Sequence, residues 1–194
     1  MAEHLSIGAG NQIERIVVSA EQLARRVQAL AEEIAARYAG KELTILAVLT
    51  GSLIFLADLI RRLPLRVRLD VVCVRSYPGP AMQSQGPQLL SPLQAGLSGK
   101  DVLIVDDILD SGLTLRAVLA AASALAPASL GTCVLLRKAR TEGDERIRPD
   151  FVGFEVGPEF LVGYGLDFDG LYRNLPDIRV LRPNGRGAGK GDKP

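Results

Sequence analysis

The residues with the clearest chemical potential lie in the stretch DVLIVDDILDSGLTLR, which spans positions 101–116. Asp106 and Asp107 follow the unbroken apolar run 102–105, which is typical of a strand buried on both faces of a parallel sheet. Ligands of open α/β sheets bind at the carboxyl ends of the strands, so we expect both carboxylates at such an edge. Carboxylate oxygens suit Mg²⁺ and also accept hydrogen bonds from sugar hydroxyls.

A turn that suits a phosphate comes directly after the two acids. Residues 110–114 read Asp-Ser-Gly-Leu-Thr, and the apolar, alanine-rich spacing of LTLRAVLAAASALA then predicts a helix. The unpaired amides and the dipole of a helix N-terminus favour an anion. The alternative is a solvated acidic loop before a capped helix. Strand, acid pair, turn and helix together indicate a site for a ribose phosphate with Mg²⁺.

The remaining sequence alternates between strands and helices that would position this site. A capping box at Ser19–Gln22 opens a helix with one apolar stripe, which Gly40 ends. Buried or edge strands are predicted at residues 16–18, 43–49, 67–74 and 130–136. Thr50, Gly51 and Ser52 form a turn into a further helix that ends at Pro64, and this turn is equally typical of a phosphate loop and of an ordinary βα connection. We therefore expect an α/β fold with a mainly parallel sheet of about five strands flanked by helices.

Composition excludes several classes of function. The net charge of +1 lacks the basic footprint of a nucleic-acid binder, and a single histidine, His4, leaves carboxylates as the obvious acid and base groups. Cys73 and Cys133 lie in apolar runs, which favours buried reduced thiols over a disulfide or a metal pair. No segment has the length of a membrane helix and the N-terminus lacks a signal pattern, so we expect a cytoplasmic protein without a membrane partner.

The central motif VLIVDDILDSGLT closely resembles the phosphoribosyl diphosphate (PRPP) binding motif of type I phosphoribosyltransferases. The resemblance implies that Asp106 and Asp107 hold the ribose hydroxyls and Mg²⁺, and that Asp110 takes the N7 proton of the base. It also implies that the 5′-phosphate is bound by the amides of Ser111, Gly112, Leu113 and Thr114.

Two further segments resemble parts of the same family. Leu49, Thr50, Gly51 and Ser52 occupy the place of a loop that binds pyrophosphate and often contains a cis peptide before its second residue. Many purine enzymes of the family carry a lysine at the position of Thr50. Ser76 and Tyr77 resemble the pair that begins a flexible catalytic loop, although prolines at 78, 80 and 87 depart from the usual composition.

The densest resemblance lies in PDFVGFEV, EFLVGYGLD and LYRNLP, and it points to the purine salvage branch of the family. It implies that Lys138 contacts the 6-oxo group of the purine, that Phe160 stacks on the base, and that the backbone of Leu161 and Asp167 meets its edge. Arg173 would reach pyrophosphate, and Asp167 would join Asp106 and Asp107 around the metal. Without the resemblance, a lysine at a strand end is usually solvated, and Phe160, Tyr164 and Phe168 are equally typical of core aromatics.

The resemblance implies a purine salvage phosphoribosyltransferase that acts on hypoxanthine or guanine, with the purine base and PRPP as its substrates. The resemblance implies Mg²⁺, a small hood built from both ends of the chain, and a homo-oligomer, either dimer or tetramer. We expect one domain at residues 1–181 and a disordered tail at 182–194, which lacks large apolar residues. The rival hypotheses are a regulatory RNA-binding protein on the same fold and a transferase that prefers xanthine or adenine.

Overall fold

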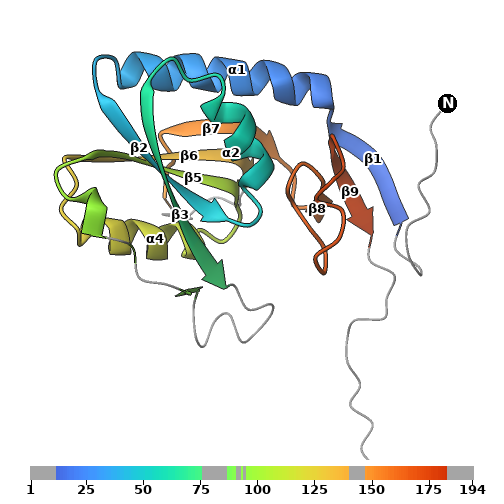
Figure 1. Ribbon diagram of the computed structural model, residues 1–194. Coiled ribbons are helices and arrows are strands. Elements are labelled where there is room, and N and C mark those ends of the chain that lie inside the picture. The colour runs from blue at the N-terminus through green and yellow to red at the C-terminus, as the bar shows by residue number, and fades with distance from the viewer. Residues whose placement is uncertain (1–11, 76–86, 91–92, 94, 140–146, 183–194) are drawn as a thin grey trace, which may run out of the picture.

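A twisted, mainly parallel sheet forms the centre of the computed structural model (Figure 1), which describes residues 12–75, 87–90, 93, 95–139 and 147–182. The strand order is β4-β3-β2-β5-β6-β7. All neighbours are parallel except β4, which pairs antiparallel with β3. The strands are β2 (Glu42–Leu49), β3 (Arg66–Arg75), β4 (Gln88–Leu89), β5 (Asp101–Leu109), β6 (Ser129–Lys138) and β7 (Phe151–Val156). The expected five-stranded parallel sheet is confirmed, and β4 adds a short edge strand within a region that we expected to be loop.

The order of the parallel strands creates one switch point. The first parallel strand along the chain, β2, lies between β3 and β5, so the connections leaving β2 and β5 run to opposite sides. In open α/β sheets, this is where the loops separate and leave a crevice at the carboxyl edge. The turns after β2 and β5 are the two that the sequence assigned to phosphate groups.

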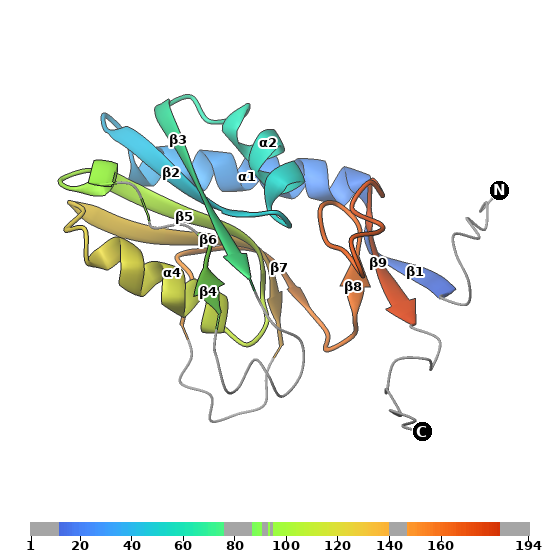
Figure 2. The same ribbon diagram turned by 60° about the horizontal axis from the view of Figure 1, so that its bottom comes forward.

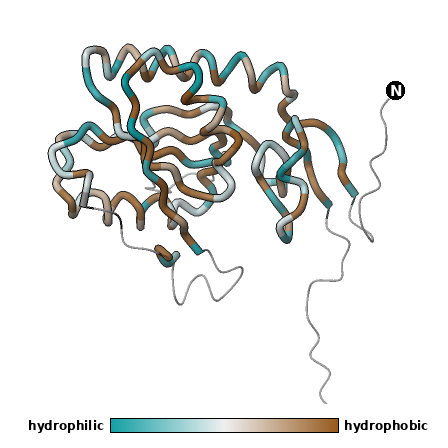
Figure 3. The backbone as a smooth tube through the Cα atoms, in the orientation of Figure 1, coloured by the Kyte–Doolittle hydropathy of each residue, from teal (hydrophilic) through white to brown (hydrophobic). Residues whose placement is uncertain are grey.

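Helices cover both faces of the sheet. Helices α1 (Ala20–Arg37) and α2 (Leu53–Ile60) lie on one face and α4 (Leu113–Ser123) on the other, which Figures 1 and 2 show from two directions. The predicted capping box is present, because the Ser19 hydroxyl accepts from the Gln22 amide at 3.2 Å and the Gln22 side chain accepts from the Ser19 amide at 2.8 Å. Hydrophobic residues concentrate on the central strands, while α1 alternates between hydrophobic and hydrophilic positions (Figure 3). Burial of these apolar faces against the sheet is the main driving force for this arrangement.

A second, three-stranded sheet forms the hood and has the order β1-β9-β8. It joins β1 (Gln12–Val18) to β8 (Leu161–Val162) and β9 (Ile178–Arg182), and both pairings are antiparallel. The hood therefore contains residues from both ends of the chain, as expected. Arg182 belongs to β9 and pairs with Glu14 at 2.8 Å, so the folded part extends one residue past the predicted boundary. The rest of the predicted tail lies outside the described residues.

No helix within the described part of the chain is long and apolar enough to cross a membrane.

Candidate active site

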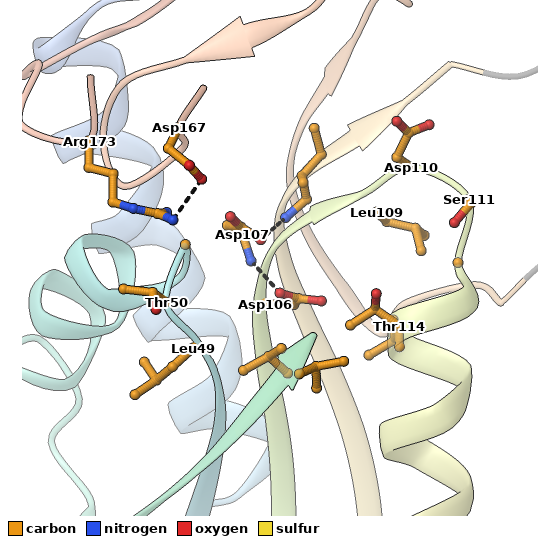
Figure 4. Close-up of a pocket in the computed structure, with 16 residues that line it drawn as sticks. Leu49, Thr50, Asp106, Asp107, Leu109, Asp110, Ser111, Thr114, Asp167 and Arg173 are labelled. Atoms are coloured by element: carbon orange, nitrogen blue, oxygen red, sulfur yellow. Dashed lines mark hydrogen bonds and ion pairs between the residues drawn. The ribbon is translucent and has the colours of Figure 1, made fainter. Parts of the chain in front are cut away.

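A cavity of about 420 Å³ opens at the carboxyl edge of the sheet, between the ends of β2 and β5. Figure 4 shows the acid pair of β5 between two groups, with Asp167 and Arg173 of the hood on one side and Ser111 and Thr114 on the other. Ten residues predicted from sequence to form the site line this crevice: Thr50, Gly51, Asp106, Asp107, Asp110, Ser111, Gly112, Thr114, Asp167 and Arg173. Residues from four separate segments therefore meet at the predicted edge.

The acid pair lies inside β5 rather than after it. The strand continues to Leu109 because β6 continues beside it, pairing Asp106 with Val134 and Leu109 with Arg137. An Asp106 side-chain oxygen accepts from the Asp107 amide at 3.0 Å, and Asp107 accepts from the Ile108 amide at 2.9 Å. The acids were expected at the carboxyl end of the apolar run 102–105, and they lie near the carboxyl end of a longer strand, because long-range pairing with β6 overrides the weak strand preference of aspartate.

Burial changes the ionisation of both carboxyls. Asp106 is only 5% exposed. Desolvation raises the pKa of Asp106 well above its ordinary value, and the neighbouring Asp107 carboxylate adds to that rise. Desolvation also raises the pKa of Asp107, against opposing contributions that include the positive charge of Arg173. In the ligand-free protein the pair therefore holds protons more tightly than free aspartates do.

The turn after β5 leads into the N-terminus of α4. Gly112 is the N-cap residue and has a φ of +74°, a left-handed conformation that glycine adopts without steric cost. The Ser111 hydroxyl accepts from the Leu113 amide at 3.4 Å. Leu113 itself does not line the crevice, and its side chain is 37% exposed at the first helical position. The helix start lies where the sequence predicted a phosphate site.

The turn after β2 lies in direct contact with the acid pair. The peptide bond between Leu49 and Thr50 is cis, as the resemblance implied. A Cβ atom added to Gly51 would lie 1.7 Å from a side-chain oxygen of Asp107, so any larger residue here would displace that carboxylate. The buried Ser52 hydroxyl donates to the Val48 carbonyl and closes the turn.

The hood contributes one carboxylate and one guanidinium group to the crevice. Arg173 forms an ion pair with Asp167 at 2.7 Å and also donates to the Gly165 carbonyl at 2.6 Å. The second carboxylate oxygen of Asp167 accepts from the Gly170 amide at 2.8 Å. These contacts fix both side chains over the Thr50–Gly51 turn.

Comparison with known proteins identifies the family. Residues 16–169 match the family model of the phosphoribosyl transferase domain. This chain belongs to the phosphoribosyltransferase family. The hypoxanthine-guanine phosphoribosyltransferase of Mycobacterium avium is 38% identical over 177 residues, which cover 88% of this chain and 87% of that protein. The enzyme of the same name from Aquifex aeolicus is 41% identical over 170 residues, covering 86% and 94%.

Solved structures agree with this assignment. The crystal structure of a hypoxanthine-guanine phosphoribosyltransferase from Bacillus anthracis superimposes with a TM-score of 0.80 at 37% identity. The match covers 89% of this chain and 100% of that one. The type I phosphoribosyltransferase fold expected from the sequence is therefore confirmed.

Of the predicted purine-side residues of this phosphoribosyltransferase, Asp167 lines the crevice, whereas Lys138, Phe160 and Leu161 do not. Lys138 ends β6 and pairs with the crevice residue Asp110 at 2.8 Å, so it lies at the border of the crevice. Phe160 is 44% exposed and packs edge-to-face on Phe168, with ring centroids 5.5 Å apart. Leu161 is only 5% exposed because its side chain belongs to the main hydrophobic core, which the hood shares with the helices and the central sheet. The structure thus places Phe160 and Leu161 on the hood and does not bring their side chains into the crevice.

Sequence analysis missed other residues that shape this phosphoribosyltransferase site. Val48, Val74, Ile108 and Leu109 supply apolar parts of the lining, and Gly165 supports it from the hood. The available signal for Gly165 was the closely spaced glycine pair in LVGYGLD, since such glycines mark close backbone approach. Ser76 and Tyr77 lie outside the described residues.

The crevice carries an excess of acidic side chains. Four carboxylates and one guanidinium line it, namely Asp106, Asp107, Asp110, Asp167 and Arg173. No group of three or more His, Cys, Asp or Glu side chains close enough to hold a metal occurs among the described residues. The three acids predicted around the metal therefore do not form a complete cage, since Asp167 is paired with Arg173.

Proposed function

We propose that the protein transfers the phosphoribosyl group of PRPP to hypoxanthine or guanine, giving the nucleoside 5′-monophosphate and pyrophosphate. The proposal depends on one observation, the meeting of the acid pair, the start of α4 and the Thr50–Gly51 turn in a single crevice. These three parts match the sugar hydroxyls, the 5′-phosphate and the pyrophosphate of PRPP. The relatives that bear the hypoxanthine-guanine name support the choice of base.

Different groups of the crevice bind different parts of PRPP. Asp106 and Asp107 accept hydrogen bonds from the ribose hydroxyls and hold the sugar. The amides at 111–114 bind the 5′-phosphate at the positive end of α4, and Arg173 neutralises part of the pyrophosphate. Held in this way, C1′ faces the incoming base nitrogen while its bond to pyrophosphate breaks.

Lys138 and Asp110 recognise the base together. Their ion pair, at 2.8 Å, occupies the donor and the acceptor that a 6-oxopurine would use. The Lys138 ammonium has only donors, so it can donate to the purine 6-oxo oxygen in place of the Asp110 carboxylate. The released carboxylate then accepts the N7 proton as general base.

The donor set of the crevice fits Mg²⁺, and we propose it as the cofactor. Magnesium ordinarily uses one or two carboxylates together with waters and substrate phosphates, so it needs no complete protein cage. Asp106, Asp107 and Asp167 are the residues that would hold it. When bound, Mg²⁺ offsets the negative charge of pyrophosphate, which four carboxylates and one guanidinium would otherwise repel.

An activity panel tests the function. We expect product from hypoxanthine and guanine with PRPP and Mg²⁺, and at least about 10⁴-fold lower kcat/KM for adenine, because its 6-amino group meets Lys138 donor to donor. If xanthine were the best substrate, the protein would be a phosphoribosyltransferase with a different base preference. RNA binding at moderate salt without turnover would instead favour the regulatory hypothesis.

We further propose a cytoplasmic homo-oligomer. Leu69 and Val71 alternate on one face of β3 and are 51% and 46% exposed, as expected of a surface that a second copy covers. Cys73 and Cys133 are both free thiols, which suits a reducing compartment. Light scattering coupled to gel filtration distinguishes monomer, dimer and tetramer.

A further inference from the structure

We propose that Tyr164 is a positioning residue, whose phenol holds the hood against α2 and so fixes the pyrophosphate side of the crevice. This inference rests on the proposed function. Tyr164 touches no substrate and acts through Gly51, Asp167 and Arg173. We call the contact between Tyr164 and Asp58 the hood latch.

The hood latch is a short hydrogen bond between two elements far apart in the sequence. The Tyr164 hydroxyl donates to one carboxylate oxygen of Asp58 at 2.6 Å. The other oxygen of Asp58 pairs with Arg61, so the carboxylate is oriented from both sides. Burial and the hydrogen bond to Asp58 raise the pKa of Tyr164, so the phenol remains a donor throughout the neutral range. Asp58 lies on α2, which begins just after the Thr50–Gly51 turn.

The backbone around Tyr164 is shaped to make this contact. Gly163, Tyr164 and Gly165 have φ values of +100°, +51° and +103°, three left-handed residues in a row. A tyrosine in this conformation is uncommon and carries a steric cost, which surrounding contacts must offset. The Tyr164 amide is bonded to the Leu175 carbonyl at 2.9 Å, and its side chain is 7% exposed. The hood latch is the polar contact that this strained segment makes with α2.

Gly165, the last of these three residues, lies directly against the Thr50–Gly51 turn. A Cβ atom on Gly165 would lie 2.1 Å from the Gly51 carbonyl oxygen, so the two backbones touch. Gly51 in turn lies against the Asp107 carboxylate. Gly165 also exchanges hydrogen bonds with Arg173, its amide donating at 3.0 Å and its carbonyl accepting at 2.6 Å. A shift of Gly165 would therefore displace Gly51, Arg173 and the Asp167 paired with it.

The hood latch lies at the edge of an open space. A cavity of about 310 Å³ lies beside it, lined by both latch residues and by Arg173. Arg173 also lines the active-site crevice, so it forms a thin wall between the two spaces. The Tyr164 ring belongs to the main hydrophobic core, and its hydroxyl, beside this cavity, is held by the hydrogen bond to Asp58.

Tyr164→Phe tests the inference because it removes only the hydroxyl. Loss of a hydrogen bond to a charged group and slight misplacement of the pyrophosphate side should raise the KM for PRPP and the Ki of Mg²⁺-pyrophosphate by about 5- to 50-fold. The Ki of ribose 5-phosphate, which uses residues 111–114 and the acid pair but lacks the pyrophosphate group, should stay within about twofold of the wild-type value. A purely structural role would lower the melting temperature and leave the ratio of the two Ki values unchanged, which would overturn the inference.

A double-mutant cycle adds a second criterion. Asp58→Ala should reproduce the kinetic effect of Tyr164→Phe, and combining the two should add little, because both remove one contact. Asp58→Asn retains an acceptor and should restore most of the pyrophosphate affinity. Tyr38→Phe is the matched control, since the buried Tyr38 hydroxyl has no hydrogen-bond partner among the described residues and packs beside Gly131 of β6. Additive effects of the two latch substitutions would refute the hood latch.

A measurement without substrate separates this inference from the proposed function. If the wild-type protein shows no transferase activity, the proposed function fails, whereas hydrogen exchange still tests the hood latch. Amides of residues 163–175 should exchange faster in Tyr164→Phe than in the wild type and in Tyr38→Phe. Unchanged exchange in this segment would overturn the hood latch whatever the enzyme does.

Discussion

Replacing Asp106 with asparagine should stabilise the ligand-free protein while weakening its site. Asparagine has nearly the same shape, and its carbonyl can still accept from the Asp107 amide, as Asp106 does at 3.0 Å. Its amide group can also donate to the Asp107 carboxylate. The substitution therefore removes a buried charge and the repulsion within the pair without opening a cavity.

The size of the effect follows from the burial of the pair. Two like charges close together in a partly polar interior repel by about 1–3 kcal/mol, and a chain of this length gains roughly 2–4 °C in Tm per kcal/mol. We therefore expect a rise of about 2–12 °C near neutral pH. Folding raises the pKa of both carboxyls, so the stability of the wild type falls as pH rises from about 3.9, the ordinary value of aspartate, through the raised values. The advantage of Asp106→Asn should be small near pH 4 and grow toward pH 8.

Thermal melts across this pH range, with and without Mg²⁺ and PRPP, provide the assay. Ligands that bind the native state should raise the Tm of the wild type and raise that of Asp106→Asn much less. Asp150→Asn serves as a contrast, because Asp150 accepts from the Thr132 amide at 2.8 Å and pairs with Arg37 at 3.0 Å, so its loss should not stabilise. A lower Tm for Asp106→Asn at pH 7 without ligand would show that the acid pair stabilises the fold, and would refute this reasoning.

Three further substitutions test individual roles in the crevice. Asp110→Asn should keep the fold and PRPP binding but lower kcat by about 10²–10⁴, the usual worth of a general base, and turnover within a few-fold of wild type would exclude that role. Lys138→Met should reduce the preference for 6-oxopurines over adenine, measured as the ratio of kcat/KM values, and an unchanged ratio would contradict the assignment. Thr50→Lys should lower the Mg²⁺ concentration needed for half-maximal activity by about 3- to 10-fold, because it adds a cation beside the acidic crevice, and an unaltered requirement would count against the charge argument.

Local sequence signals predicted the elements that carry the site because the relevant forces act over a few residues. The capping box at Ser19 and the glycine at Gly112 each specify backbone geometry within one turn, and both appear where expected. The apolar runs that became β2 and β6 are strands buried on both faces, which periodicity identifies directly. Because parallel strands share one carboxyl edge, the meeting of the acid pair with the Thr50–Gly51 turn followed from the strand assignments.

The features that sequence did not reveal depend on long-range contacts. The extension of β5 through Asp106 and Asp107 requires β6 as a partner, and β4 exists only because β3 offers an open edge. The positions of Phe160 and Leu161 depend on how the hood packs, and the hood joins residues from opposite ends of the chain. The contact of Gly165 with Gly51 likewise joins positions more than a hundred residues apart, so no local pattern could specify it.

The position of the acid pair within a strand explains how two desolvated, adjacent carboxyls can be held in place for ligand binding. Two carboxylates on a loop could move apart and hydrate, whereas Asp106 is held by its pairing with Val134 and by the ladder that continues to Leu109. The strand thus keeps both carboxyls desolvated, which raises both pKa values, and it holds the Asp107 charge beside Asp106, which raises the pKa of Asp106 further, before any ligand arrives. A preorganised site of this kind requires little rearrangement on binding, so a cation and the ribose hydroxyls gain the full benefit of oxygens already in position. A cation bound between the carboxylates cancels their repulsion, and this gain adds to the free energy of binding. The same repulsion that destabilises the ligand-free crevice should therefore increase its affinity for PRPP with Mg²⁺.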